Sequence, residues 1–339
     1  MRGNKVSSIF ERVFRRNSDI FRSFGLFCAY GVWILAFHLI LLSLVTYFVG
    51  SFSLGSLVGG LRDSAVPLPR FEEVNDAFAA VELSFLGFAS VLFLFLLRWL
   101  NPLMSASWRD FFTPQLFERD FVPAFVRGVI VASGIVLAFL FSGVYRFFGF
   151  IIQIEDAPGA LANILLRVLS VGIWVYCEEN IFRKRIFERL LAPPHERSLV
   201  GVAAAILTTS LLFCGLRALQ FDLGIIQTFT IFLVSIALCF KALLEKDVLY
   251  GAGFWVALLV VWHCLLSLPI LGTDFSGLLM VKYQTPSVTS VLSPVTARVL
   301  TGGEGGVLSS VLFQLLLGVE IVRLAVRYLK SFQKTLSKT

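Results

Sequence analysis

Long apolar runs alternate with short polar segments along most of the chain. Eight runs are long and apolar enough to be predicted as membrane-spanning helices. The ten-residue segments of alternating polarity that are typical of membrane barrels are absent, so the sequence predicts an all-α, polytopic transmembrane helix bundle. The predicted spans are Phe24–Val49, Val81–Leu97, Phe125–Tyr145, Leu161–Cys177, Leu199–Leu216, Leu223–Phe240, Tyr250–Leu271 and Val307–Val322.

Composition and charge agree with a membrane protein. Hydrophobic residues make up 57% of the chain and charged residues only 15%, which excludes an ordinary soluble domain. With the N-terminus inside, the cytoplasmic segments hold 21 of the 29 lysines and arginines and the external segments hold 6. This asymmetry predicts cytoplasmic N- and C-termini, in the inner (cytoplasmic) membrane of a cell. The net charge of +7 is distributed as expected for contact with anionic lipids, and nucleic acid is not a predicted partner.

The pattern divides the chain into five regions and predicts no soluble domain. They are a basic cytoplasmic arm (1–23), a three-span region (24–150), a four-span core (151–271), an extracytoplasmic loop (272–306), and a last span with a basic tail (307–339).

Two adjacent carboxylates mark the end of the fourth apolar run, and a group of arginines follows them. Ionisable groups at such depth are costly, so they are paired, face the protein interior or serve a function. In a helix, Glu179 and Arg183 stand four residues apart, in the favourable orientation for an ion pair. Glu178 lies about 100° round the helix and lacks that partner. Glu178 is therefore a candidate catalytic carboxylate, and an ion-pair cluster that fixes helix packing is the alternative.

Depth in the bundle brings three distant stretches to similar levels. Nothing breaks the fourth helix before Pro193-Pro194, which places Glu178 roughly 24 Å from that turn. The stretch Phe213–Arg217 on the next span lies roughly 25–30 Å from the same turn. His263 lies about 20 Å along the seventh span from Tyr250. We therefore expect the three stretches to meet inside the bundle.

These stretches resemble the motifs of the CAAX protease and bacteriocin-processing family of intramembrane proteases. The family's EExxxR motif corresponds to Glu178–Arg183, its FxxxH motif to the frame Phe213–Arg217, and its HxxxN motif to the frame Leu259–His263. The resemblance covers roughly Leu161 to Leu316. It implies a helical membrane core and a glutamate-dependent endopeptidase activity.

The resemblance also implies roles for particular residues. Glu178 would activate water as the base, with Glu179 and Arg183 as structural partners. His263 would stand in the position of the family's asparagine, preceded by Trp262, and assist proton transfer.

Two departures from the family's motifs put hydrolysis in doubt. Arg217 stands where the family has a histidine, and its guanidinium cannot exchange a proton near neutral pH. Leu259 replaces a second histidine and has no hydrogen-bonding capacity.

No cofactor or metal is predicted. The five cysteines lie in or beside predicted spans without CxxC spacing, as expected for apolar packing residues. Zinc usually takes three or four ligands from Cys, His, Asp or Glu, and the sequence offers Glu178, His263 and one cysteine at most.

Three functions stay open on the sequence alone. The first is a divergent endopeptidase in which Glu178 and His263 act on water. The second is an inactive relative that binds a membrane-tethered peptide or protein, or a lipid, in the same cavity. A transporter is the third, since buried charges also line translocation paths, although matching broken helices and repeated halves are absent.

Overall fold

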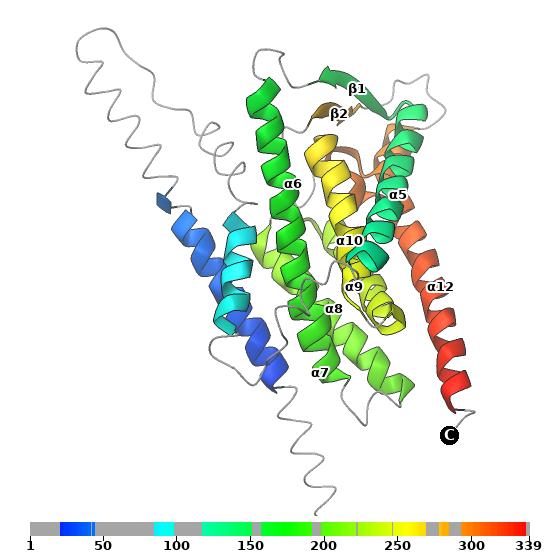
Figure 1. Ribbon diagram of the computed structural model, residues 1–339. Helices are drawn as coiled ribbons and strands as arrows, with labels where there is room; N and C mark the ends of the chain where they lie inside the picture. The colour runs from blue at the N-terminus through cyan, green and yellow to red at the C-terminus, as the bar shows by residue number, and fades with distance from the viewer. Residues whose placement is uncertain are drawn as a thin grey trace, which may run out of the picture.

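The computed structural model describes residues 21–41, 43–44, 85–97, 117–150, 157–191, 198–221, 223–245, 247–268, 278–284 and 293–336. These residues form a predominantly helical bundle, as predicted, with one small sheet that the sequence did not predict (Figure 1). Two further helices, Phe21–Leu41 and Phe85–Leu97, precede the labelled elements. The labelled elements are η2 (Phe117–Phe121), α5 (Val122–Phe141), β1 (Tyr145–Phe150), α6 (Ala157–Glu179), η4 (Asn180–Phe187), α7 (Glu188–Leu190), α8 (Leu199–Gln220), α9 (Ile225–Glu245), α10 (Leu249–Leu259), η6 (Val260–Leu265), β2 (Leu279–Tyr283), α11 (Pro294–Thr301), η7 (Gly303–Gly305), η8 (Val307–Ser309) and α12 (Val311–Leu336).

Four helices among the described residues are long and apolar enough to cross a membrane, and they indicate a multi-pass membrane protein. They are Phe21–Leu41, Arg119–Phe141, Leu199–Gln220 and Ile225–Glu245. Two shorter apolar helices, Phe85–Leu97 and Leu249–Leu265, coincide with predicted spans. The third predicted span is too long at its end, because the helix stops at Phe141 and Tyr145 begins a strand.

The helix that carries the two glutamates continues past them, as the sequence predicts. The elements α6, η4 and α7 follow one another without a break from Ala157 to Leu190. The segment η4 is π-helical, which the sequence did not predict. Single π-helical turns inserted in α-helices are often found at functional sites, so η4 is a candidate part of such a site. The predicted Pro193-Pro194 turn and most of the basic arm lie outside the described residues.

Close helix packing joins α5 to α10. A Cβ atom at Gly128 would lie 2.5 Å from the Cβ of Ala257, and one at Gly253 would lie 2.5 Å from the carbonyl oxygen of Phe121. Only glycine leaves room for this approach, as is usual where helix backbones pack tightly in membranes. The contact fixes the depth and rotation of α10 relative to α5.

The N-terminal helices Phe21–Leu41 and Phe85–Leu97 lie beside α6 (Figure 1). They are joined by two hydrogen bonds: the Trp33 indole donates to the Ala89 carbonyl over 2.8 Å, and the Tyr30 and Ser90 hydroxyls lie 2.8 Å apart. Tyr30 also reaches α6 itself. The helix pair is thus part of the enclosure around the end of α6.

One end of the bundle is covered by segments of the loop that the sequence places outside the cytoplasm. Strand β2 pairs antiparallel with β1, from Tyr145 opposite Tyr283 to Phe150 opposite Leu279. The Tyr145 hydroxyl donates to the Gly303 carbonyl over 3.0 Å. The glycine-rich turn that contains η7 is bound to α9, because the Gln227 side chain donates to the carbonyl of Gly305. This part of region 272–306 is therefore folded structure.

Candidate functional site

The site lies where α6 passes into η4, and its first component is an ion pair between helices. The Glu178 carboxylate on α6 contacts the Arg217 guanidinium near the end of α8. Neither side chain is more than 1% exposed. The Tyr30 hydroxyl lies 3.4 Å from the second carboxylate oxygen and donates to it. Three separate helices therefore meet at one carboxylate.

Aromatic rings enclose Arg217. The centre of its guanidinium lies 4.0 Å from the Trp174 ring, 5.1 Å from Phe213 and 5.8 Å from Phe221. One of its nitrogens also donates to the Gln220 side-chain oxygen over 3.2 Å. A guanidinium stacks well on ring faces, and this attraction is strongest when water is excluded. Arg217 is thus held by both its carboxylate and its surroundings.

A second ion pair follows within the same helix. The Arg183 guanidinium lies 2.9 Å from the Glu179 carboxylate, at the i,i+4 spacing that the sequence predicts. Arg183 also donates to the Ser235 hydroxyl of α9 over 2.9 Å. Its guanidinium lies 4.3 Å from the Phe213 ring, which Arg217 also contacts. Phe213 therefore touches both guanidinium groups.

These two pairs form the ion-pair cluster: Glu178, Glu179, Arg183 and Arg217. Its two negative charges balance its two positive charges. Buried charges are tolerated when paired and hydrogen-bonded, and removing one partner then leaves the other exposed to the full cost of desolvation. The expectation that a glutamate at this depth pairs with Arg183 or Arg217 is confirmed for both glutamates. The cluster joins α6, α8 and α9.

The third predicted stretch does not reach this cluster. On α10, Gly251 faces Glu179, because a Cβ atom there would lie 3.3 Å from a Glu179 carboxylate oxygen. His263 is twelve residues further along the same helix, a rise of about 18 Å. It lies within electrostatic range of Arg167, which precedes Glu178 by eleven residues on α6. The structure therefore brings together Glu178 and Arg217 and places His263 at another level, which corrects the expectation that all three stretches meet.

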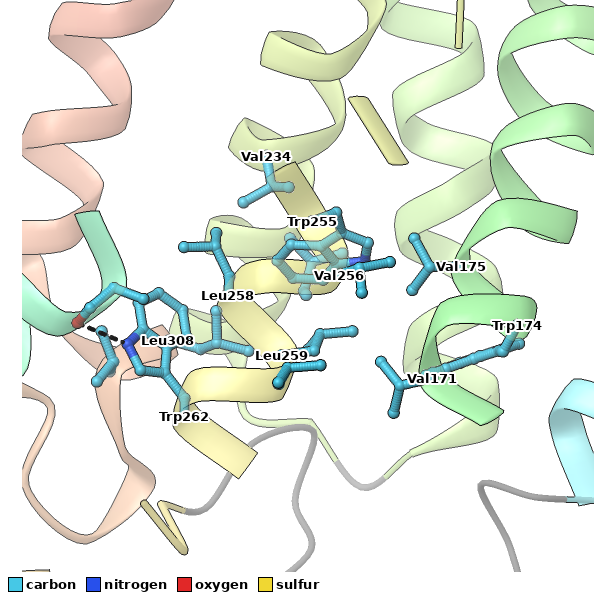
Figure 2. Packing of buried hydrophobic residues seen from close by; sticks show 14 of the residues in the cluster. Val171, Trp174, Val175, Val234, Trp255, Val256, Leu258, Leu259, Trp262 and Leu308 are labelled. Carbon is cyan, nitrogen blue, oxygen red and sulfur yellow. Dashed lines mark hydrogen bonds between the residues drawn. The ribbon is translucent and has the colours of Figure 1, made fainter. Parts of the chain in front are cut away.

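The remaining predicted residues of that stretch face apolar surroundings. Leu259 packs in the apolar cluster and lies beside Val171 of α6 (Figure 2). Trp262 points towards α5 and α12: its indole nitrogen donates to the Ala132 carbonyl over 3.1 Å, and its ring lies 5.1 Å from Phe313. Trp262 is thus a packing residue in this structure. A supporting position beside Glu178 is not available to it.

Three partners of the cluster were not identified from the sequence, namely Tyr30, Ser90 and Ser235. Each is a polar side chain within a long apolar run, and each is fully buried. The sequence shows only that these polar residues interrupt apolar runs. It does not show which carboxylate or guanidinium they face. Among the described residues, no three side chains of His, Cys, Asp or Glu come together as a metal site would require.

Comparisons with known proteins give no match to a family model, to a curated protein or to a solved structure.

Proposed function

We propose that this chain is an eight-span membrane protein with a core similar to the CAAX-type intramembrane proteases, and that it binds a membrane partner without hydrolysing it. The observation that supports this is the ion pair between Glu178 and Arg217. Arg217 occupies the position of the family's histidine in the second motif. In that family the histidine assists the glutamate in proton transfer, and a guanidinium cannot take this part near neutral pH.

The surroundings of Glu178 support the same view. The carboxylate is almost completely buried, and its neighbours are Arg217, Tyr30 and the aromatic rings around the arginine. His263, the remaining candidate for general acid or base, lies at another depth. Loss of a general acid or base typically lowers turnover by about 100- to 10,000-fold. Binding of a membrane-tethered peptide or protein, or of a lipid, requires no such group.

A peptidase assay tests this proposal. The full-length wild type, Glu178→Gln and Arg217→His would be purified and incubated with a panel of membrane-tethered peptides. We expect no cleavage by the wild type. Cleavage by the wild type that disappears in Glu178→Gln would establish the alternative, a glutamate-dependent endopeptidase. Cleavage that appears only in Arg217→His would support the view that the arginine silences the site.

The proposed topology has a separate test. Single cysteines at Ser7, Ser290 and Ser337, in a background without the native cysteines, would be labelled from outside the cell. Cytoplasmic termini predict labelling of position 290 alone, because the positive charges favour the cytoplasmic side. Labelling of position 7 or 337 would contradict the eight-span arrangement.

A further inference from the structure

A second group of charged side chains surrounds Tyr250, at the beginning of α10. Arg127 of α5 donates to the Tyr250 hydroxyl over 2.8 Å. The Lys241 amine of α9 lies 4.1 Å from the centre of the Tyr250 ring. Arg323 of α12 lies within electrostatic range of the same tyrosine. We call Arg127, Lys241 and Arg323 the basic cluster. Four helices contribute to it when the tyrosine is included.

The basic cluster lacks the charge balance of the ion-pair cluster. Within the described part of the chain, no carboxylate lies within ion-pairing distance of Lys241 or Arg127. Arg323 is paired with Glu320 of its own helix. The Lys241 side chain is only 8% exposed, and its amine lies over the Tyr250 ring, a weaker partner for a cation than a carboxylate. This arrangement leaves Lys241 and the N–H groups of Arg127 able to bind an anion from outside the chain.

Its position in the bundle indicates where that anion would come from. Tyr250 is the second residue of α10, and tyrosine is enriched where membrane spans meet the headgroup region. Exposed apolar side chains continue from this level along the neighbouring helices, with Val126 and Ile130 on α5 and Val319 and Val322 on α12. The second half of α12 adds further basic residues: Arg327, Lys330 and Lys334. Cations thus meet an apolar face, as the two parts of a phospholipid require.

We propose that the basic cluster binds the phosphate of an anionic phospholipid, with the acyl chains along the exposed faces of α5 and α12. The Lys241 amine and the free N–H groups of Arg127 can donate to phosphate oxygens, and such charge-assisted bonds are strong. The Tyr250 hydroxyl accepts from Arg127, so its own proton remains available for a third bond. The positive charge asymmetry assigns this end to the cytoplasmic leaflet, where anionic lipids gather. This inference does not depend on the absence of peptidase activity.

The test is a lipid titration of the purified full chain in neutral maltoside micelles. The thermal unfolding midpoint would be followed as phosphatidylglycerol, phosphatidylcholine or inorganic phosphate is added. We expect saturable stabilisation by phosphatidylglycerol alone. In Lys241→Met, and in Arg127→Gln, the apparent affinity for phosphatidylglycerol should fall about tenfold or more, because each change removes a charge-assisted hydrogen bond.

Arg119→Gln is the matched control, since it removes the same charge from an exposed side chain paired with Asp120 near the same end of α5. It should leave the titration unchanged. Equal stabilisation by phosphatidylcholine, or an unchanged affinity in Lys241→Met that still unfolds cooperatively, would overturn the proposal. Stabilisation by inorganic phosphate as strong as that by the lipid would also overturn it, because the ligand would then be the free ion.

Discussion

The ion-pair cluster and the basic cluster differ in how the chain balances their cations. In the ion-pair cluster each guanidinium contacts a carboxylate, and aromatic rings close the surroundings. In the basic cluster the Lys241 side chain is also largely buried, but its amine lies over the Tyr250 ring, and among the described residues no carboxylate is within ion-pairing distance. A charge that the chain itself balances holds helices together. A charge that the chain leaves unbalanced is suited to a ligand.

The largest loss of stability is expected when one member of the ion-pair cluster is removed. Arg217→Leu should lower the free energy of unfolding by about 3–5 kcal/mol, because Glu178 is left buried without its partner. Denaturant or thermal unfolding in detergent would measure it. Arg323→Leu, which removes a half-exposed guanidinium from a pair on α12, should cost no more than about 1 kcal/mol. The double change Glu178→Leu with Arg217→Leu should lose less than Arg217→Leu alone; a strictly additive result would contradict the buried pair.

Substitution of a glycine between α10 and α5 should lower the stability by a smaller amount. It should also disturb the basic cluster, which these helices help to form. Gly253→Ala should destabilise the protein by about 1–3 kcal/mol, since the new methyl group would meet the Phe121 carbonyl. It should also weaken phosphatidylglycerol binding, because Tyr250 and Arg127 are carried by these two helices. Gly134→Ala on α5 is the control, as a Cβ there meets nothing within 4 Å. Equal midpoints for the two variants would show that the close approach is absent.

The tyrosine that reaches into the ion-pair cluster provides a finer test. Tyr30→Phe removes the hydroxyl that serves both Glu178 and Ser90, and should cost about 1 kcal/mol. The comparison is Ser43→Ala, whose exposed hydroxyl bonds only to its own helix. If both variants unfold at the wild-type midpoint, the N-terminal helices do not close the cluster.

The smallest effect should come from Lys241→Met when anionic lipid is absent. The change removes a buried charge without a carboxylate partner and keeps most of the apolar volume, so stability should shift by less than about 1 kcal/mol, or increase. The change in the free energy of unfolding should therefore differ most clearly between Lys241→Met and Arg217→Leu in lipid-free detergent. A loss in Lys241→Met as large as that in Arg217→Leu would mean that the lysine is balanced within the chain.

Local features of the sequence were sufficient to predict the helical fold and one ion pair. Apolar runs predict membrane helices because backbone groups in lipid must be satisfied within the segment. The pair Glu179–Arg183 follows from helix spacing alone, since residues four apart lie on one face. The continuation of the helix to Leu190 likewise follows from the absence of a breaker.

Contacts between helices were decided only by the tertiary structure. Depth arithmetic placed Glu178, Arg217 and His263 at comparable levels, but it could not give the relative height and rotation of the helices. The close approach of α5 and α10 at Gly128 and Gly253 is one such contact, and it sets the position of α10. The π-helical segment η6 also changes the direction of His263, because a wide turn takes up an additional residue. The pairing of Glu178 with Arg217, and the separation of His263 from both, therefore had to come from packing.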